Sequence, residues 1–309
     1  MNENWTTENI PDLTGKVIII TGANIGLGFE TALEVARKGA QTIMACRNMD
    51  KAQAALADIH SEIPNAHVEI MQLDLASQES IRQFVEAFHQ KYDRLDILVN
   101  NAGIMMVPYG TTVDGFERQF GTNHLGHFAL TGRLLDLIKK TPGARVVTVS
   151  SLAHHRGDMD FDNLMYEGGN GYDRQDAYGR SKLANLLFTY ELQRQFEKHD
   201  VEATAVAAHP GISTTNLADH LLRRWYFRIL VPIFKLMAQS AAQGALTNLR
   251  AAVDPTIKGG QYVGPDKPNE RTGYPVVVQS NAASHNEADA QKLWQVSEEL
   301  TGVHFNWNN

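Results

Sequence analysis

The sequence predicts an α/β protein with one doubly wound parallel β-sheet covered by helices on both faces. Short apolar segments alternate along the chain with longer segments in which apolar residues recur at helical spacing. The short segments are apolar at nearly every position, which is typical of strands that are buried on both faces of a parallel sheet. Because parallel strands must be joined by crossover helices, the alternation predicts a doubly wound arrangement.

Six short apolar segments account for the predicted strands, and the segments between them account for the helices. The strands are expected at residues 17–21, 41–46, 67–73, 96–100, 145–150 and 201–207. The first three helices are expected at about 27–38, 50–60 and 77–92, where Gly39 would end the first and Ser77 would cap the third. Ser284 and Glu287 have the spacing of a capping box at the start of a C-terminal helix.

The chain shows no second alternating series and no linker rich in Pro, Gly or Ser, so we expect a single domain over residues 1–309. One amphipathic and irregular segment, at about 214–239, is expected to be an insertion. A lid over an apolar substrate explains this segment best, but a membrane-surface helix and simple core packing explain the same pattern.

Composition excludes several functional classes. Hydrophobic residues make up 43% of the 309 residues, enough for a large core, and a net charge of −7 disfavours nonspecific nucleic-acid binding. Cys46 is the single cysteine, so an internal disulfide is excluded. The polar N-terminus lacks a signal-peptide pattern, and the most apolar late segment, 225–236, is too short and too charged to span a bilayer. We therefore expect a cytoplasmic protein without a nucleic-acid partner.

The turn after the first strand has the features of a phosphate-binding site. It reads TGANIGLG, with glycines between the end of a strand and the start of a helix. Glycines at that place let backbone amides approach a pyrophosphate, and the helix dipole favours the anion. Tight turns also use glycine for steric reasons alone. The position of this turn favours a Rossmann-type dinucleotide site formed by Gly22, Asn24, Ile25, Gly26, Leu27 and Gly28.

The ends of the next three strands carry further candidate contacts to a dinucleotide. Arg47 follows the second strand with no carboxylate before it, which favours NADP(H) over NAD(H), although a solvated residue at helix entry would look the same. Asp74, beside Leu75 at the end of the third strand, could accept from the adenine amino group or cap a helix. The fourth strand ends in NNAG, which could lie against the nucleotide or form a tight turn through Asn101, Ala102 and Gly103.

Tyr178 and Lys182 are the candidate proton-transfer pair. Residues four apart share one helix face, and a nearby ammonium lowers the pKa of a phenol toward the working pH. Ser151 follows the fifth strand at the same edge of the sheet and could orient a substrate oxygen. A Tyr-x-x-x-Lys pair alone favours a structural interpretation. The order in which all these motifs occur is what favours a catalytic site.

Together the motifs TGANIGLG, NNAG, NHLGHF, VSS and YGRSK resemble those of the short-chain dehydrogenase/reductase family, over residues from about 15 to 302. Within the family, the chain is most similar to the branch of retinol dehydrogenases and WW-domain oxidoreductases. The resemblance implies that Tyr178 is the general acid or base, that Lys182 holds the nicotinamide ribose and that Ser151 holds the substrate oxygen. The long gap between Ser151 and Tyr178 resembles this branch, so the two are expected to converge.

The same resemblance implies roles for four further residues. Asn123, in NHLGHF, would support a water relay behind Lys182, although a helix residue bonded to its own backbone explains it too. The loop after the sixth strand would meet the nicotinamide carboxamide through Pro210, Gly211 and Thr215. This loop departs from the branch at Asn216, where an acid is common.

These expectations describe an NADP(H)-dependent oxidoreductase that interconverts a carbonyl and an alcohol on a small lipophilic substrate by hydride transfer. A catalytically silent regulatory protein that binds a dinucleotide on the same fold is the alternative. The resemblance also suggests a homodimer through the helix that carries Tyr178. No metal site is expected, because no cysteine or carboxylate at zinc spacing accompanies His124, His127, His154, His155 and His209.

Overall fold

The computed structural model describes residues 4–213 and 238–307. Nearly all of the predicted insertion at 214–239, with its candidate roles as lid, membrane-surface helix or core packing, lies outside the described residues, and so do Thr215 and Asn216. No helix in the described part of the chain combines the length and the apolar character that a bilayer crossing requires.

Within the described residues, eight strands form one sheet in the order β3-β2-β1-β4-β5-β6-β7-β8. The strands from β1 to β7 pair in parallel, and β8 pairs antiparallel with β7 at the edge. Their bounds are β1 Val17–Thr21, β2 Gln41–Cys46, β3 Val68–Gln72, β4 Ile97–Asn100, β5 Ala144–Val149, β6 Ala203–Ala208, β7 Tyr262–Pro265 and β8 Pro275–Val278. The mostly parallel α/β sheet confirms the predicted fold class.

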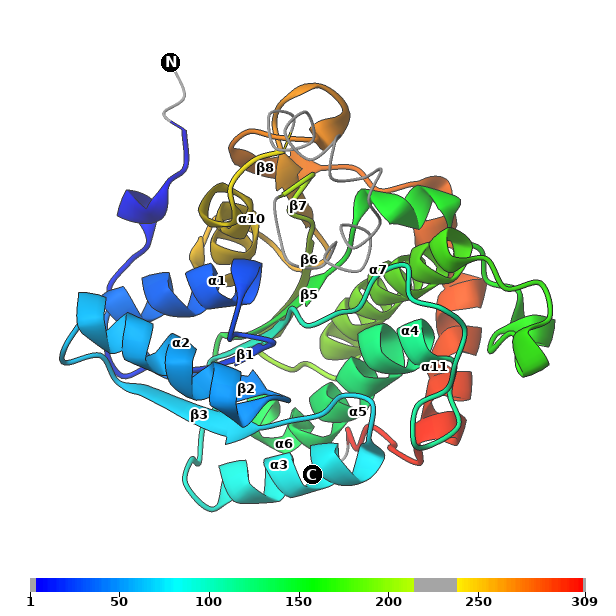
Figure 1. Cartoon of the computed structure of the whole chain (residues 1–309), viewed down its shortest axis with the longest axis horizontal. Coiled ribbons are helices and arrows are strands. Elements are labelled where there is room, and N and C mark those ends of the chain that lie inside the picture. Colours follow the sequence, from blue (N-terminus) through cyan, green and yellow to red (C-terminus); the bar gives the residue numbers. More distant parts are fainter. Residues whose placement is uncertain (1–3, 214–237, 308–309) are drawn as a thin grey trace.

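Helices cover both faces of this sheet (Figure 1). One face is covered by α1 (Gly26–Arg37), α2 (Met49–Glu62) and α10 (Ala241–Val253). The other is covered by α3 (Gln78–His89), α5 (Gly126–Arg133), α6 (Leu135–Lys140), α7 (Arg174–Lys198) and α11 (Glu287–Thr301), and the short α4 (Arg118–Phe120) lies nearby. In β1, Ile18 and Ile20 pack toward the first group, and Val17 and Ile19 toward the second. Because these strands are apolar on both faces, their side chains pack into two hydrophobic cores, one on each side of the sheet.

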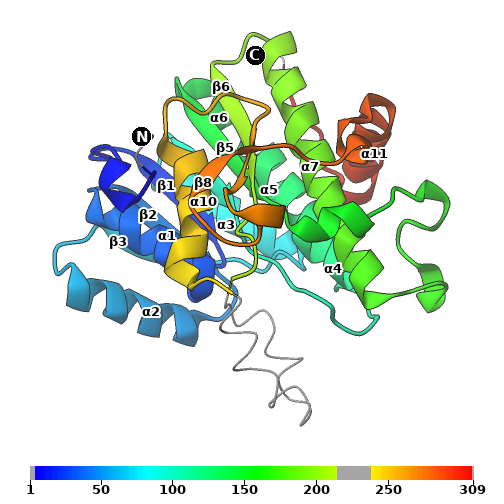
Figure 2. The ribbon, with the colours of Figure 1, turned by 90° about the horizontal axis from the view of Figure 1, so that it is seen from above.

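The sheet reverses its direction of winding between β1 and β4, which are neighbours in space but not in sequence. The crossovers after β1 and β2 run over one face, and those after β3, β4 and β5 run over the other (Figure 2). Helices on opposite faces leave a crevice at the C-terminal ends of β1 and β4, where open α/β sheets bind their ligands.

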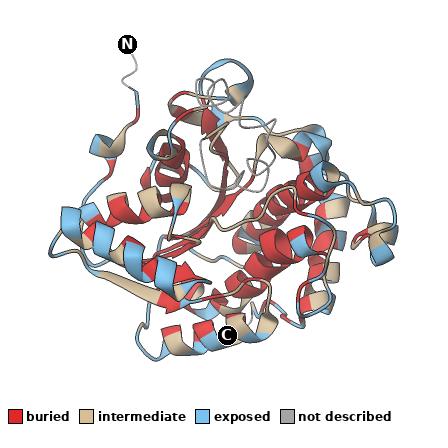
Figure 3. Cartoon of the chain, in the orientation of Figure 1, coloured by how far each residue is buried: buried red, intermediate tan, exposed pale blue. Residues whose placement is uncertain are grey.

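Helix α7 is buried along most of its length (Figure 3). Every residue from 177 to 192 is buried, because α7 packs on the sheet on one side and on α11 on the other. Leu183 and Leu187 share a core cluster with Leu293 of α11. This packing holds the N-terminal turn of α7 in place. A homodimer through this helix stays a prediction.

The N-terminal caps show where local sequence reasoning succeeded and failed. Ser77 caps α3 by accepting from the amide of Ser80, as predicted. The capping box predicted for Ser284 and Glu287 is wrong, because Asn286 caps α11 instead. Ser284 lies in a preceding turn and donates to the carbonyl oxygen of Asn281. The extra turn moves the start of the helix beyond the reach of Ser284.

Candidate active site

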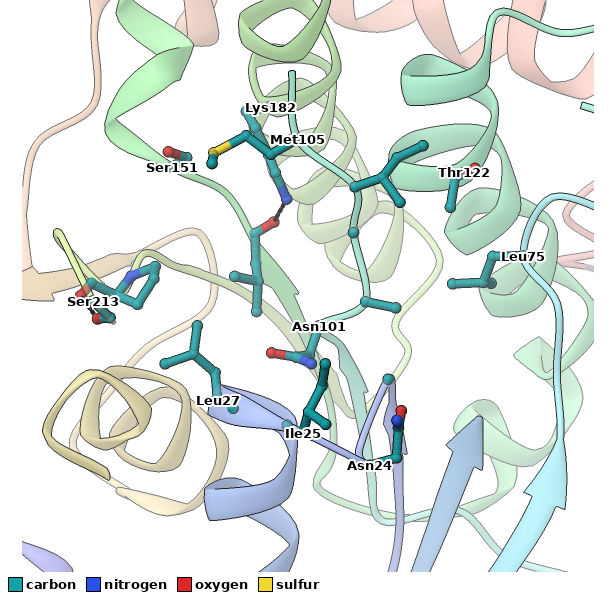
Figure 4. Close-up of a pocket in the computed structure, with 18 of the residues that line it drawn as sticks. Asn24, Ile25, Leu27, Leu75, Asn101, Met105, Thr122, Ser151, Lys182 and Ser213 are labelled. Carbon is teal, nitrogen blue, oxygen red and sulfur yellow. Dashed lines mark hydrogen bonds between the residues drawn. The ribbon is translucent and has the colours of Figure 1, made fainter. Parts of the chain in front are cut away.

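A cavity of about 640 Å³ opens at the crevice between β1 and β4. Figure 4 shows side chains converging on it from the first strand–helix turn, from the segments after β3, β4, β5 and β6, and from α7. Among the predicted site residues that the structure describes, all line this cavity except Asn123. Segments that are far apart in the sequence therefore meet around one space.

The glycine-rich turn forms a cradle at one wall of the cavity. Gly22 and Gly26 have φ values of 67° and 57°, which favour glycine. A side chain at Gly28 would run into the carbonyl oxygen of Gly22. The N-cap of α1 is Ile25, which supplies no side-chain hydrogen bond to the first amides of the helix. Free amides at the positive end of a helix dipole fit the phosphates of a dinucleotide.

The end of β2 contributes basic and polar side chains to the same cavity. Arg47 lines it, and so do Asn48 and Lys51. Asn48 caps α2 by accepting from the amide of Lys51 at 2.9 Å. Asp50 does not line the cavity. The sequence prediction missed Lys51, although its place in the first turn of the helix after Arg47 could have indicated it.

Asp74 lines the cavity, and its carboxylate is engaged locally. Its Oδ1 accepts a 3.0 Å hydrogen bond from the amide of Ala76. Ser77, and not Asp74, is the N-cap of α3, so the interpretation of Asp74 as a helix cap is wrong. A contact from Asp74 to adenine stays a prediction.

The NNAG segment is held to the end of β1 by Thr21. The Thr21 hydroxyl accepts from the amides of Asn101 and Ala102, each at 2.9 Å. The Asn101 side chain donates to the carbonyl oxygen of Thr21 at 2.8 Å. These contacts hold the segment, which lines the cavity, against the end of β1. A Cβ at Gly103 would lie 3.3 Å from the Oδ1 of Asn123, which is closer than an ordinary contact, so a glycine here leaves room for the asparagine.

Tyr178, Lys182 and Ser151 meet at the other end of the cavity. Lys182 donates from Nζ to the carbonyl oxygen of Val149 at 2.9 Å (Figure 4), and its Nζ lies 5.7 Å from the centroid of the Tyr178 ring. Ser151 follows β5, and its hydroxyl accepts from the amide of Ala153. The long sequence gap between Ser151 and Tyr178 therefore does not prevent their convergence.

Burial dominates the protonation of this pair. It raises the pKa of Tyr178 to about 12, against an opposing effect of the Ser151 hydroxyl. It lowers the pKa of Lys182 to about 8. We expected Lys182 to lower the pKa of Tyr178. Among the protein's own groups, however, removal from water is the largest cause, and the group that opposes it is the Ser151 hydroxyl.

Asn123 lies behind the cavity, in a π-helical turn at Gly121–Leu125. Its side chain accepts from the amide of Ile104 at 2.8 Å and donates to the carbonyl oxygen of Ile104 at 3.0 Å. It also lies 2.9 Å from the hydroxyl of Ser181, one residue before Lys182. Asn123 therefore ties the segment after β4 to α7 and does not bond its own helix backbone. The water relay stays a prediction.

Comparison with known proteins identifies the family. Residues 16–224 match the family model of the short chain dehydrogenases. The chain belongs to this family. Retinol dehydrogenase 12 of Mus musculus is 42% identical over 302 residues, which cover 97% of this chain and 90% of that protein. Retinol dehydrogenase 13 of Homo sapiens is 42% identical over 297 residues, which cover 94% of this chain and 86% of that protein.

A solved structure supports the same conclusion. The crystal structure of an uncharacterized protein from Mycobacterium paratuberculosis has a TM-score of 0.82 and 40% sequence identity, and covers 98% of this chain and 100% of that chain. The protein is therefore a short-chain dehydrogenase similar to retinol dehydrogenases, and an oxidoreductase of alcohols and carbonyls.

The histidines of this short-chain dehydrogenase have structural partners. His127 lies 2.9 Å from both the Thr21 hydroxyl and the carbonyl oxygen of Asn123, and burial lowers its pKa to about 4. His154 contacts the carbonyl oxygen of Ser151, and His124 contacts a serine of α11. Neither His154 nor His155 lines the cavity. In the described part of the chain, no group of three or more His, Cys, Asp or Glu side chains is placed to hold a metal ion.

An apolar wall of this short-chain dehydrogenase was not predicted from the sequence. Ile104, Met105, Met106 and Leu152 line the cavity near its reactive end. Met106 has a φ of 52°, unusual for a residue with a side chain, and its amide donates to the buried Gln119 side chain at 2.7 Å. Two adjacent methionines after NNAG could have indicated this adaptable apolar surface.

Proposed function

We propose that this short-chain dehydrogenase is an NADP(H)-dependent oxidoreductase that interconverts a carbonyl and an alcohol on a small lipophilic substrate. One observation carries the proposal. A single cavity joins the glycine cradle and the basic residues after β2 to Ser151, Tyr178 and Lys182. A dinucleotide bound by its phosphates at the cradle would extend toward these three side chains.

The choice of NADP(H) rests on the charges at the end of β2. Arg47 and Lys51 line the cavity there, and the adjacent Asp50 does not. A guanidinium and an ammonium favour a 2′-phosphate, whereas a free ribose 2′-hydroxyl would be met by a carboxylate. The same two cations would attract the phosphate at long range.

A nicotinamide bound in this cavity would supply the hydride chemistry, and side chains of the protein would transfer the proton. With a pKa of about 12, the Tyr178 phenol keeps its proton at neutral pH. It can therefore donate this proton from Oη to the oxygen of a carbonyl that is being reduced. The Ser151 hydroxyl would hold that oxygen, and the Lys182 ammonium would stabilise the phenolate that forms. In the reverse reaction, the same oxygen would have to be deprotonated before it could accept the proton of an alcohol.

The lipophilic substrate follows from the apolar wall at the reactive end. Ile104, Met105, Met106 and Leu152 offer surface that gains free energy by excluding water from an apolar molecule. Methionine side chains adapt to irregular apolar shapes. The relatives named retinol dehydrogenase point to the same class, since retinol is a lipophilic alcohol.

The proposal is tested by following NADPH and NADH oxidation with retinaldehyde, long-chain aldehydes and steroid ketones. We expect turnover with NADPH, and a loss of at least about a hundredfold in Tyr178→Phe, because the proton donor is removed. Tyr92→Phe is the matched control, since Tyr92 packs on Phe88 away from the cavity. Full activity in Tyr178→Phe would contradict the mechanism. Tight NADPH binding without turnover on any carbonyl or alcohol would favour the silent regulatory protein.

A further inference from the structure

The loop between β7 and β8, residues 266–274, contains two adjacent residues in the left-handed region. Asn269 has a φ of 58° and Glu270 a φ of 53°. Asparagine adopts this region readily, but a glutamate does so at a cost in backbone strain. Such strain persists only where the surroundings determine the backbone, and it is concentrated at functional sites. The contacts of Glu270 show what this loop holds.

Glu270 reaches from the loop to a buried histidine. Its Oε2 lies 2.9 Å from the Nε2 of His209, whose side chain is fully buried. A side chain at Gly264 of β7 would collide with the His209 ring, so the strand leaves space for it. The hydrogen bond to His209 is also the main reason why the pKa of Glu270 lies below its ordinary value.

The partners of His209 determine which of its ring nitrogens carries a proton. The amide of Gly211 donates to Nδ1 at 3.3 Å, so Nδ1 acts as an acceptor. Nε2 then carries the proton and donates it to the carboxylate of Glu270. The ring thus connects Glu270 directly to the backbone of Gly211.

The next residue of the loop holds the same segment from a second side. The amide of Ile212 donates to the carbonyl oxygen of Arg271 at 2.7 Å. A side chain at Gly211, whose φ is 63°, would collide with that carbonyl oxygen. Residues 210–213, held in this way, line the same cavity as Tyr178 and Lys182.

We propose that Glu270 is a positioning residue, which acts through His209 to hold the Pro210–Gly211 backbone at the wall of the dinucleotide cavity. Glu270 makes this contact from a left-handed backbone conformation. Glu270 itself does not line the cavity. The inference rests on the proposed function in one respect, namely that the cavity binds a dinucleotide.

The test compares Glu270→Ala with Glu270→Gln in the full-length protein. Dissociation constants for NADPH and NADH are measured by fluorescence titration, kcat with retinaldehyde, and stability by thermal unfolding. We expect Glu270→Ala to weaken dinucleotide binding about tenfold, because an acceptor for a buried donor is lost. Glu270→Gln keeps an acceptor oxygen for Nε2–H and is expected to bind within about threefold of the wild type.

Asn269→Gly is the matched control. Glycine keeps the left-handed conformation accessible at this exposed neighbour and leaves the carboxylate of Glu270 in place, so binding is expected to be unchanged. The inference is overturned if Glu270→Ala lowers only the unfolding temperature, or if both dissociation constants stay within twofold of the wild type. A wild type that binds neither dinucleotide would overturn the proposed function together with the inference. If the wild type binds a dinucleotide but does not reduce retinaldehyde, the dissociation constants of the Glu270 variants still decide the inference.

Discussion

The Nζ of Lys182 donates a 2.9 Å hydrogen bond to the carbonyl oxygen of Val149, the last residue of β5. Asn185, on the same helix, donates to the same oxygen at 3.1 Å. A lysine side chain is long and flexible, and the first of these contacts attaches its Nζ to the end of an interior strand of the sheet. The ammonium is therefore held at the sheet end, beside the ring of Tyr178, at the expense of its contact with water.

That burial predicts a dependence of stability on pH. It lowers the pKa of Lys182 from 10.5 to about 8 in the folded protein. Below pH 8 both states carry the proton. Between about pH 8 and 10.5 the unfolded chain binds a proton that the folded chain has released, so this group makes stability rise with pH. In urea unfolding at pH 7 to 10, the stability of Lys182→Met relative to the wild type should fall as pH rises. A difference that does not vary with pH would contradict the burial of a titrating ammonium.

Ser151→Ala should reduce the rate of carbonyl reduction without unfolding the protein. The hydroxyl is the one neighbour found to oppose the rise in the pKa of Tyr178, and it would also donate to the substrate oxygen. Removing one such donor costs about a hundredfold in kcat. Steady-state kinetics with NADPH would measure the loss, and dinucleotide affinity serves as the internal control, because it should change little. Equal losses in binding and turnover would mean that Ser151 supports the cavity and not the reaction.

Arg47→Ala and Lys51→Ala test the basis of cofactor preference. Each should raise the dissociation constant for NADPH by about tenfold to a hundredfold, because a charge-assisted contact to a phosphate is lost. Affinity for NADH should stay nearly constant. In the wild type, the ratio of the dissociation constants for NADH and NADPH should fall as salt is added. Asp50→Ala is a control from the same turn whose side chain does not line the cavity. If the affinities for NADPH and NADH fell equally, these residues would contact a part of the dinucleotide that both cofactors share.

The sequence was informative where a pattern repeats or a motif is local. The six strands with continuous apolar runs were predicted to within two residues of their observed ends. β7 and β8 were missed because each has four residues and contains a proline, which gives no periodic signal. The cap of α11 was predicted at the wrong residue because Ser284 and Asn286 both suit an N-cap, and Ser284 belongs to the short helical turn that precedes α11.

In the candidate site, too, the residues in local motifs could be predicted and those placed by tertiary contacts could not. Motif residues could be predicted because each follows a strand, and parallel strands end at one edge. Contacts that loops make with residues distant in the sequence have no recognisable sequence pattern. Glu270 reaches His209 across 61 positions, and its strained backbone has no signature in the surrounding residues. The pKa of Tyr178 was expected in the wrong direction, because the extent of burial is a property of the packed core.

Asn123→Ala should destabilise the protein more than the loss of an ordinary surface asparagine does. Its side chain satisfies the amide and the carbonyl oxygen of Ile104 and also contacts the hydroxyl of Ser181, and the residue is fully buried. Alanine would remove this partner from the amide and the carbonyl oxygen of Ile104, at a cost of about 2–4 kcal/mol in the free energy of unfolding, whereas the Ser181 hydroxyl still donates to the carbonyl oxygen of Tyr178.

The control is Asn163→Ala, which loses one exposed hydrogen bond to Asn170 and should change stability by less than about 0.5 kcal/mol. Urea unfolding measures both, and kcat for the folded fraction separates the two roles of Asn123. Ile104 and Ser181 adjoin Gly103 and Lys182 in sequence, so a loosened contact should lower kcat beyond what the fraction of folded protein explains. If kcat per folded molecule matches the wild type, Asn123 maintains the fold alone, and the relay implied for it is excluded.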